Sequence, residues 1–338
     1  MPSHRNVVSV LAVLLLTTPI GAQEAARSAL IWYDRGDAAA LNLVSGPGGR
    51  DREPGTNFRF LRESVSGTSP KFEVEDENGV TWKAKLGEEV HGETAAARLL
   101  WAAGYVVDED YYRAQIRVRD MKTLTRGQHF VSSDGVVTGV RLERDVPNAD
   151  SSAWSWYDNP LRGTREFNGL RVMMALINNW DLKGVNNADA ATAAGGRIYS
   201  ITDLGSSFGR TGDALRRSKG VATEYAESRF IDKVTPTHVD FVLHSRPFFP
   251  TAVHITNYRF RTRMESIVKD IPLADARWIG DRLSQLSAAQ IGDCFRAGGF
   301  APADVATYTQ VVMRRIAALR DLPAPSIARA VASSSRGF

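Results

Sequence analysis

The sequence is short of cysteine and of paired histidines, and both shortages limit its chemistry. Only one of its 338 residues, Cys294, is a cysteine, so the chain cannot form an internal disulfide. The six histidines show no close metal-ligand pair, which argues against a histidine-based zinc site. Cysteine usage is therefore compatible with an exported protein without indicating one.

A large excess of charge is also missing. The 42 lysines and arginines face 38 acidic residues, and the net charge of +4 is too small to indicate a nucleic-acid-binding protein. We interpret the basic segment 210–219 as solvated surface, with contact to an anionic acceptor as the alternative. Hydrophobic residues make up 43% of the chain, which at this length is enough for two lobes around a shared cleft.

The apolar run at the N-terminus, residues 7–16, is too short to span a bilayer securely, so no stable transmembrane segment is expected. It follows Arg5 and precedes a boundary of small residues at 19–23, the three zones of a secretory signal peptide. We therefore predict that residues 1–23 are removed and that the mature chain is extracytoplasmic, periplasmic or secreted. Residues 24–55 would form an N-terminal extension, and 322–338 a flexible tail.

The most informative motif is Asp181-Leu-Lys183-Gly-Val-Asn186, followed by a second acidic turn at Asp203-Leu-Gly205. Transfer of a γ-phosphoryl group requires a carboxylate that accepts the acceptor's proton, a cation and metal ions. Asp181 is the candidate base, and Lys183 is the candidate cation at the γ-phosphate. The oxygens of Asn186 and Asp203 are the hard ligands that Mg²⁺ prefers. The motif therefore predicts a site for ATP and Mg²⁺.

This spacing resembles protein kinases, whose catalytic loop runs Asp-Leu-Lys-x-x-Asn and is followed by an Asp-Phe-Gly turn. The chain departs from that pattern at Leu204, which replaces the Phe, and at Asn179-Trp180, which replaces the His-Arg before the base. An Ala-Pro-Glu motif is missing as well. The chain therefore looks more like the wider kinase-like superfamily of HipA-type, spore-coat, secretory-pathway and phosphoinositide kinases. Regulation by loop phosphorylation is not expected.

Alternating residues predict three strands upstream, within residues 57–86. The loop between the first two strands is small and rich in hydroxyl groups, and we expect it to bind the phosphates of the nucleotide. The phosphate-binding candidates in this loop are Ser66, Gly67, Thr68 and Ser69. The loop has one glycine where kinases usually have three.

The third strand carries Lys83 and Lys85 on one face, because side chains alternate along a strand. The resemblance implies that one of them binds the α- and β-phosphates and pairs with a glutamate on the next helix. Glu93 opens a helical pattern over 93–103 and is the candidate partner. We favour Lys85, which is nearer to the helix, and leave Lys83 open.

The predicted fold class is α+β, a two-lobed protein-kinase-like fold. Residues 56–147 form a small antiparallel β-sheet lobe with one helix that binds the nucleotide, and residues 148–321 form a larger, mainly helical catalytic lobe. Two more strands, 111–118 and 135–143, complete the small lobe, which ends in a hinge near Pro147. In the large lobe the patterns predict a hairpin over 188–201 and helices over 165–179, 276–286, 288–297 and 303–319.

Three alternatives remain open from the sequence. Gly205-Ser-Ser207-Phe-Gly209 matches the nucleophile elbow of serine hydrolases, with Asp240 and His254 downstream, although a helix does not begin well after it. A kinase fold can also serve as a binding protein without activity. Transfer of a nucleotidyl group is the third possibility. The acceptor is unknown: a hydroxyl of a protein, a sugar or a lipid head group fits equally well.

Overall fold

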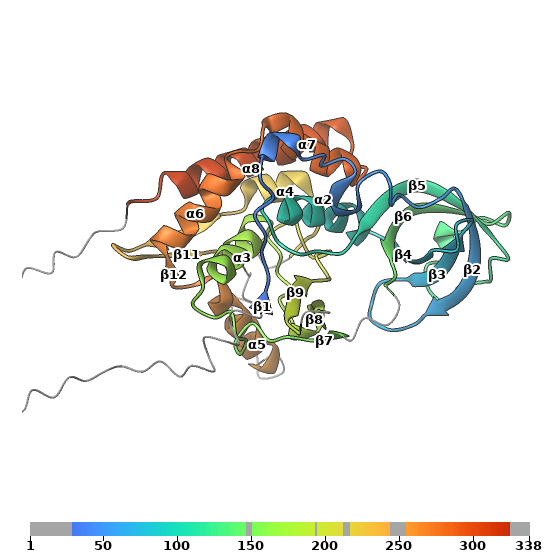
Figure 1. Ribbon diagram of the computed structural model, residues 1–338, viewed down its shortest axis with the longest axis horizontal. Helices are drawn as coiled ribbons and strands as arrows, with labels where there is room; N and C mark the ends of the chain where they lie inside the picture. The colour runs from blue at the N-terminus through green and yellow to red at the C-terminus, as the bar shows by residue number, and fades with distance from the viewer. Residues whose placement is uncertain (1–28, 147–150, 193–194, 212–216, 244–254, 325–338) are drawn as a thin grey trace, which may run out of the picture.

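The computed structural model describes residues 29–146, 151–192, 195–211, 217–243 and 255–324. The predicted signal peptide, the hinge at Pro147, residue His254 and most of the predicted tail lie outside these ranges. Figure 1 shows an α+β molecule with a β-rich lobe at one end and a mainly helical lobe at the other. The predicted fold class is therefore confirmed.

The small lobe is a closed barrel with the strand order β2-β3-β4-β6-β5. Its strands are β2 (Asn57–Ser64), β3 (Lys71–Asp76), β4 (Thr81–Leu86), β5 (Asp110–Arg119) and β6 (Val136–Arg144). All five strands were predicted, and neighbouring strands pair antiparallel as expected, except at the closure. There β2 pairs parallel with β5, with Asn57 opposite Arg117. The predicted antiparallel sheet thus has one parallel seam, which leaves it without open edges.

The barrel has its own core because each strand turns alternate residues inward. Phe58, Phe72, Trp82 and Tyr111 belong to this core and are almost completely buried. Their outward neighbours carry charges, including Lys83 and Lys85 on β4. The alternation that predicted the strands therefore also places the charged side chains outside the barrel.

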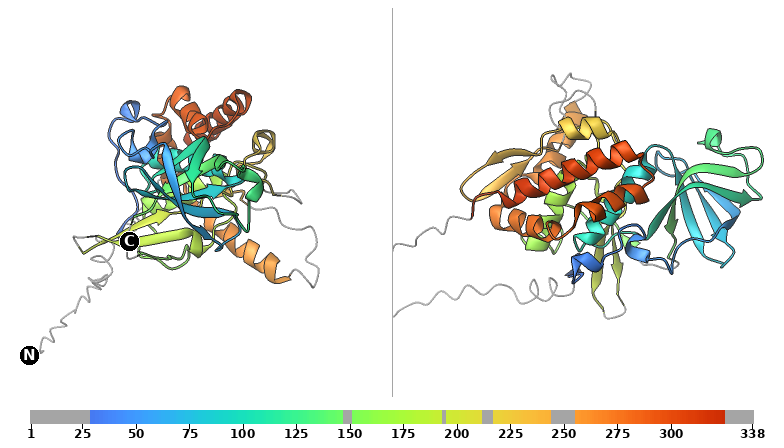
Figure 2. Two further views of the ribbon diagram at one scale, coloured as in Figure 1. Left: turned by 90° about the vertical axis from the view of Figure 1, so that its right-hand side faces the viewer. Right: turned by 90° about the horizontal axis from the view of Figure 1, so that it is seen from above.

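Helix α2 (Glu89–Ala102) lies between the lobes and packs with the large one (Figures 1 and 2). Its residues Ala95, Ala96, Leu99 and Leu100 are fully buried in the same hydrophobic cluster as the helices of the large lobe. The Nδ1 atom of His91 also lies 2.6 Å from the backbone oxygen of Gly298. The helix, which was predicted to belong to the small lobe, also contacts the barrel: Arg98 pairs with Asp110 on β5, and Glu93 lies near Arg141 on β6.

The large lobe is built from the helices α3 (Arg165–Leu176), α4 (Ala222–Glu227), α5 (Ile255–Glu265), α6 (Leu273–Leu283), α7 (Ala288–Ala297) and α8 (Pro302–Arg320). Local signals explain several of their ends. Thr164 caps α3, Ser287 and Gln290 form a capping box at α7, and Pro302 opens α8. None of the helices in the described ranges is long and apolar enough to cross a membrane.

Short strands complete the large lobe. One sheet has the order β1-β9-β8-β7, with β1 (Ala29–Leu30), β7 (Ser151–Ser152), β8 (Asn187–Ala191) and β9 (Arg197–Ile201); a second joins β10 (Ile231–Val234), β11 (His238–Phe241) and β12 (Ile271–Pro272). The pair β8–β9 is the predicted hairpin. It carries Asn186 at its entry and Asp203 at its exit, so the hairpin brings these two residues together.

Candidate nucleotide and metal site

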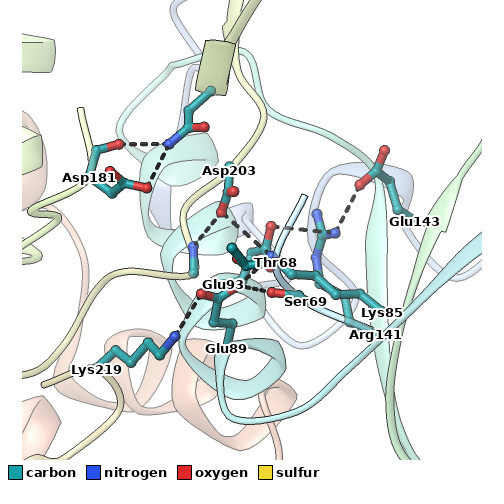
Figure 3. Close-up of polar contacts among 12 residues, drawn as sticks. Thr68, Ser69, Lys85, Glu89, Glu93, Arg141, Glu143, Asp181, Asp203 and Lys219 are labelled. Atoms are coloured by element: carbon teal, nitrogen blue, oxygen red, sulfur yellow. Dashed lines mark hydrogen bonds and ion pairs between the residues drawn. The ribbon is translucent and has the colours of Figure 1, made fainter. Parts of the chain in front are cut away.

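The candidate site lies where β4, the start of α2 and the loops around β8 and β9 meet (Figure 3). Lys85 is at its centre. Its ammonium nitrogen lies 2.8 Å from a carboxylate oxygen of Glu93, 2.8 Å from Glu89 and 3.5 Å from Asp203. Four charged residues from three separate stretches of the chain therefore converge, including the predicted Lys85, Glu93 and Asp203.

The two candidate lysines of β4 have different surroundings. The side chain of Lys85 is 12% exposed, whereas that of Lys83 is 48% exposed and pairs with Glu143 and Asp145. Burial alone would lower the pKa of Lys85, but the carboxylates of Glu93, Asp203 and Glu89 outweigh it and raise that pKa above its usual value. Lys85 is therefore a cation at neutral pH, and it alone of the pair reaches Glu93.

Glu93 is held from its other side by a buried network. Arg141 on β6 lies 3.5 Å from Glu93 and donates through Nε to Asp110, at 2.6 Å. Arg98 on α2 donates to the same Asp110 at 2.7 Å. All of these side chains are almost completely buried, so removing one charge would leave its partner unpaired in a low-dielectric interior. The network fixes Glu93 relative to the barrel.

Glu89 belongs to the site, although the sequence analysis missed it. One of its oxygens accepts from Ser69 at 2.7 Å and contacts Lys85, and the other accepts from Lys219 at 2.8 Å. Burial opposes ionisation, but Lys85 and Lys219 lower the pKa of Glu89 to about 2. Glu89 lies one helical turn before Glu93, a spacing that could have revealed it.

Glu89, Glu93 and Asp203 each offer an oxygen within 4.8 Å of the others. Hard carboxylate oxygens at this separation fit a divalent cation such as Mg²⁺. Asn186 lies apart from this cluster: its amide nitrogen donates 2.7 Å to the backbone oxygen of Asp181, and its backbone oxygen accepts from Asp203 at 3.4 Å. The two predicted metal ligands, Asn186 and Asp203, are therefore joined by a backbone hydrogen bond. The side-chain oxygen of Asn186 makes no hydrogen bond to a described residue.

Asp181 and Lys183 lie in the loop that the motif predicts to be the catalytic loop. The carboxylate of Asp181 lies 2.8 Å from the ammonium of Lys183, which is exposed. Asn179 is buried and accepts from the backbone nitrogen of Asp181 at 3.1 Å, which orients the start of the loop. Figure 3 shows Asp181 apart from the cluster around Lys85, whereas the carboxylate of Asp203 points toward that cluster.

The residues that depart from the kinase motif have structural contacts of their own. Trp180, in the position of the missing Arg, donates from its indole nitrogen to the backbone oxygen of Ser218 at 3.0 Å. The guanidinium of Arg217 lies 4.0 Å from the centre of its ring. Trp180 therefore connects the segment that carries Lys219 to the loop of Asp181. This connection does not require a phosphorylated residue.

The surroundings of the Gly-x-Ser-x-Gly match differ from those of a nucleophile elbow in the described residues. Ser207 is fully buried, and its hydroxyl has no hydrogen-bond partner among the described residues. Within ranges 195–211 and 217–243, the next helix after Ser207 is α4, which begins at Ala222. Asp240 lies on β11, where it accepts from the backbone nitrogen of Asp270 at 2.8 Å. A fully buried hydroxyl that contacts no base in the described part of the chain is not accessible to a substrate, so the geometry argues against the hydrolase alternative.

Comparisons with known proteins find similar solved structures at low sequence identity. No family model matches the sequence, and no curated protein matches it. Among solved structures, the Helicobacter pylori proinflammatory kinase CtkA is similar over 79% of this chain and 99% of its own, with 12% identity and a TM-score of 0.36. The Golgi casein kinase with Mn/ADP bound is similar over 79% of this chain and 72% of its own, with 10% identity and a TM-score of 0.41.

Proposed function

We propose that this chain is a kinase-like phosphotransferase that moves the γ-phosphoryl group of ATP to a hydroxyl acceptor, in a reaction that depends on Mg²⁺. The convergence of Lys85, Glu93 and Asp203 between the two lobes carries the proposal. Their positions on β4, on α2 and after β9 are the positions that the kinase resemblance assigns to them. A lysine held by a buried glutamate beside a metal-binding carboxylate is suited to bind a triphosphate.

Each residue then has a defined task. Lys85 binds the α- and β-phosphates, and Glu93 holds its ammonium in place. Asp203 and Asn186 are the proposed metal ligands, with Glu89 as a further oxygen donor within reach. A bound Mg²⁺ would neutralise charge on the phosphate oxygens. Loop residues Ser66, Gly67, Thr68 and Ser69 cover the phosphates.

The chemical step is a displacement at phosphorus. The acceptor's hydroxyl oxygen forms a bond to the γ-phosphorus while the bond from that phosphorus to the bridging oxygen breaks and ADP leaves. The hydroxyl proton passes to the carboxylate of Asp181, and Lys183 stabilises the charge on the γ-phosphoryl oxygens. The ion pair between Lys183 and Asp181 supports these two roles, because it holds the ammonium 2.8 Å from the carboxylate.

The test compares transfer from ATP labelled at the γ-phosphate with transfer from ATP labelled at the α-phosphate, to the protein itself and to candidate acceptors. We expect transfer of the γ label only. Asp181→Asn keeps the size of the side chain but removes its charge, so turnover should fall by about 100-fold or more while nucleotide affinity hardly changes.

Asp158→Asn is the matched control, because Asp158 is exposed in the same lobe and makes no hydrogen bond or ion pair with a described residue. It should behave as the wild type. Full transfer by Asp181→Asn would refute the base assignment. Transfer of the α label would indicate a nucleotidyltransferase, and nucleotide binding without any transfer would indicate a binding protein.

We also propose that the chain is exported, because the N-terminal segment has the three zones of a signal peptide.

A further inference from the structure

The loop between β2 and β3 is held by a guanidinium from a distant part of the chain. Arg126 lies in the connection between β5 and β6. Its Nη1 atom donates to the backbone oxygens of Gly67, at 2.7 Å, and Thr68, at 3.2 Å. Its Nη2 atom donates to those of Ser64, at 3.3 Å, and Ser66, at 3.4 Å. One side chain thus binds four carbonyl groups of a single loop.

This contact leaves the other side of the loop backbone unpaired. The backbone nitrogens of residues 65–69 make no hydrogen bond to a described residue, and residues 65–68 are exposed. Successive free N–H groups in a turn form a concave site for anions. The end of the loop is fixed toward the charged cluster, because Ser69 donates to Glu89 at 2.7 Å.

Arg126 is itself held rigidly. The backbone nitrogens of Thr125 and Arg126 donate to the two carboxylate oxygens of Glu63, at 2.9 and 3.2 Å. The next residue, Gly127, has a φ of +77°, and an added Cβ there would lie 2.7 Å from Pro70. Arg126 is thus fixed to β2 on one side, and the residue after it packs closely against the start of β3.

We propose that Arg126 is a positioning residue that holds the β2–β3 loop as a cradle for the phosphates of a nucleoside triphosphate. Glycine-rich loops reach such a shape through several residues with positive φ. Only Gly67 is available for that here, with a φ of +67°. Arg126 draws four carbonyl oxygens away from the phosphate side and adds a positive charge behind the loop. The inference rests on the proposed function, since it concerns the same nucleotide.

The test measures the affinity of the full-length protein for Mg²⁺-ATP and for adenosine by calorimetry. Arg126→Ala should weaken ATP binding about tenfold, because hydrogen bonds from a charged donor are lost and the loop amides are no longer aligned. Adenosine affinity should not change. Arg126→Lys should recover part of the ATP affinity, since one ammonium cannot reach four carbonyls at once.

Arg62→Ala is the matched control. Arg62 lies on β2, the strand that leads into the loop; its side chain is 74% exposed, and it pairs with Glu73 instead of the loop. The Arg62→Ala variant also loses one positive charge, and its affinities for Mg²⁺-ATP and for adenosine should equal those of the wild type. Thermal melting of each variant shows whether the barrel remains folded.

Equal ATP affinity of Arg126→Ala and wild type would overturn the inference and leave the phosphotransferase proposal intact. A parallel loss of adenosine binding would also overturn it, because the effect would then be on the fold of the lobe. Failure of the wild type to bind ATP would overturn both proposals. The expected affinity pattern without any transfer of the γ label would support the cradle and refute the phosphotransferase.

Discussion

The Nη1 atom of Arg315 donates to the side-chain oxygen of Asn178 at 2.7 Å, and this contact ties α8 to the turn before the catalytic loop. Asn178 has a φ of +55°, so the chain reverses there after α3. Its amide nitrogen donates to the backbone oxygen of Gly209 at 2.7 Å. The two residues therefore connect α8, the catalytic loop and the segment after Asp203.

Replacing Arg315 by methionine should destabilise the large lobe. The same guanidinium also binds the backbone oxygens of Leu176 and Ser228, which would lose buried partners. We expect the free energy of unfolding to fall by about 3 kcal/mol, measured by urea denaturation. Arg314→Met, at an exposed neighbour that donates to Ala226, is the control. If the two variants had the same free energy of unfolding, the buried contacts of Arg315 would contribute no more to stability than the exposed contact of Arg314.

Lys85→Ala should reduce both nucleotide affinity and turnover. It removes the cation that faces three carboxylates and that we propose to bind the phosphates, and we expect ATP affinity to fall about tenfold or more. Lys83→Ala is the internal control, because Lys83 forms exposed pairs two residues earlier on the same strand. Its effect on ATP affinity should be negligible. The opposite ranking would assign the phosphate lysine to Lys83.

Local patterns predicted much of this structure. Alternation identified the first three barrel strands, and the spacing of the Asp-Leu-Lys-x-x-Asn motif selected Asp181, Asn186 and Asp203, which lie at the two ends of the β8–β9 hairpin. The parallel seam between β2 and β5 was not predictable in this way, because alternation within a strand does not specify its neighbour. Arg126 and Lys219 were missed for a similar reason: their contacts join segments far apart in the sequence.

Glu89 was missed for a local reason. The predicted helix began at Glu93, directly after a segment that contains Gly87 and Gly92, and glycine has a low helix propensity. In the structure α2 starts at Glu89 and continues through Gly92. An added Cβ on Gly92 would lie 3.6 Å from the backbone oxygen of Ser207, so the helix packs closely on the loop there. Tertiary packing offsets the low helix propensity of this glycine.

The stability of the barrel should depend on Glu77 at acidic pH. Its two carboxylate oxygens accept from the backbone nitrogens of Thr56 and Asn57, each at 2.9 Å, and these bonds lower its pKa to about 2. A lowered folded-state pKa gives stability that is present above the unfolded value of 4.5 and is lost as pH falls toward 2.

The difference in urea midpoint between wild type and Glu77→Gln should therefore be largest near neutral pH and shrink between pH 4.5 and about 2. Glu88→Gln is the charge control, because that exposed side chain makes no hydrogen bond or ion pair with a described residue. A difference that stays constant with pH would contradict the role of Glu77.

The export proposal predicts a shortened N-terminus. The precursor should be cleaved between Gly21 and Ala25 and recovered in an extracytoplasmic fraction, because the export machinery recognises the apolar run and a peptidase removes it. N-terminal sequencing of the purified protein checks this. Intact Met1 on cytoplasmic protein would disprove it.

The most direct test of the proposed site is the effect of Mg²⁺ on ATP binding, measured by calorimetry for the wild type and for Asp203→Asn. Asp203 is partly exposed, so this substitution should leave the fold intact while it removes a charged oxygen ligand. We predict that Mg²⁺ strengthens ATP binding to the wild type about tenfold or more and has no such effect on Asp203→Asn. An equal gain from Mg²⁺ in both proteins would contradict the assignment of Asp203 and, with it, the proposed metal-nucleotide site.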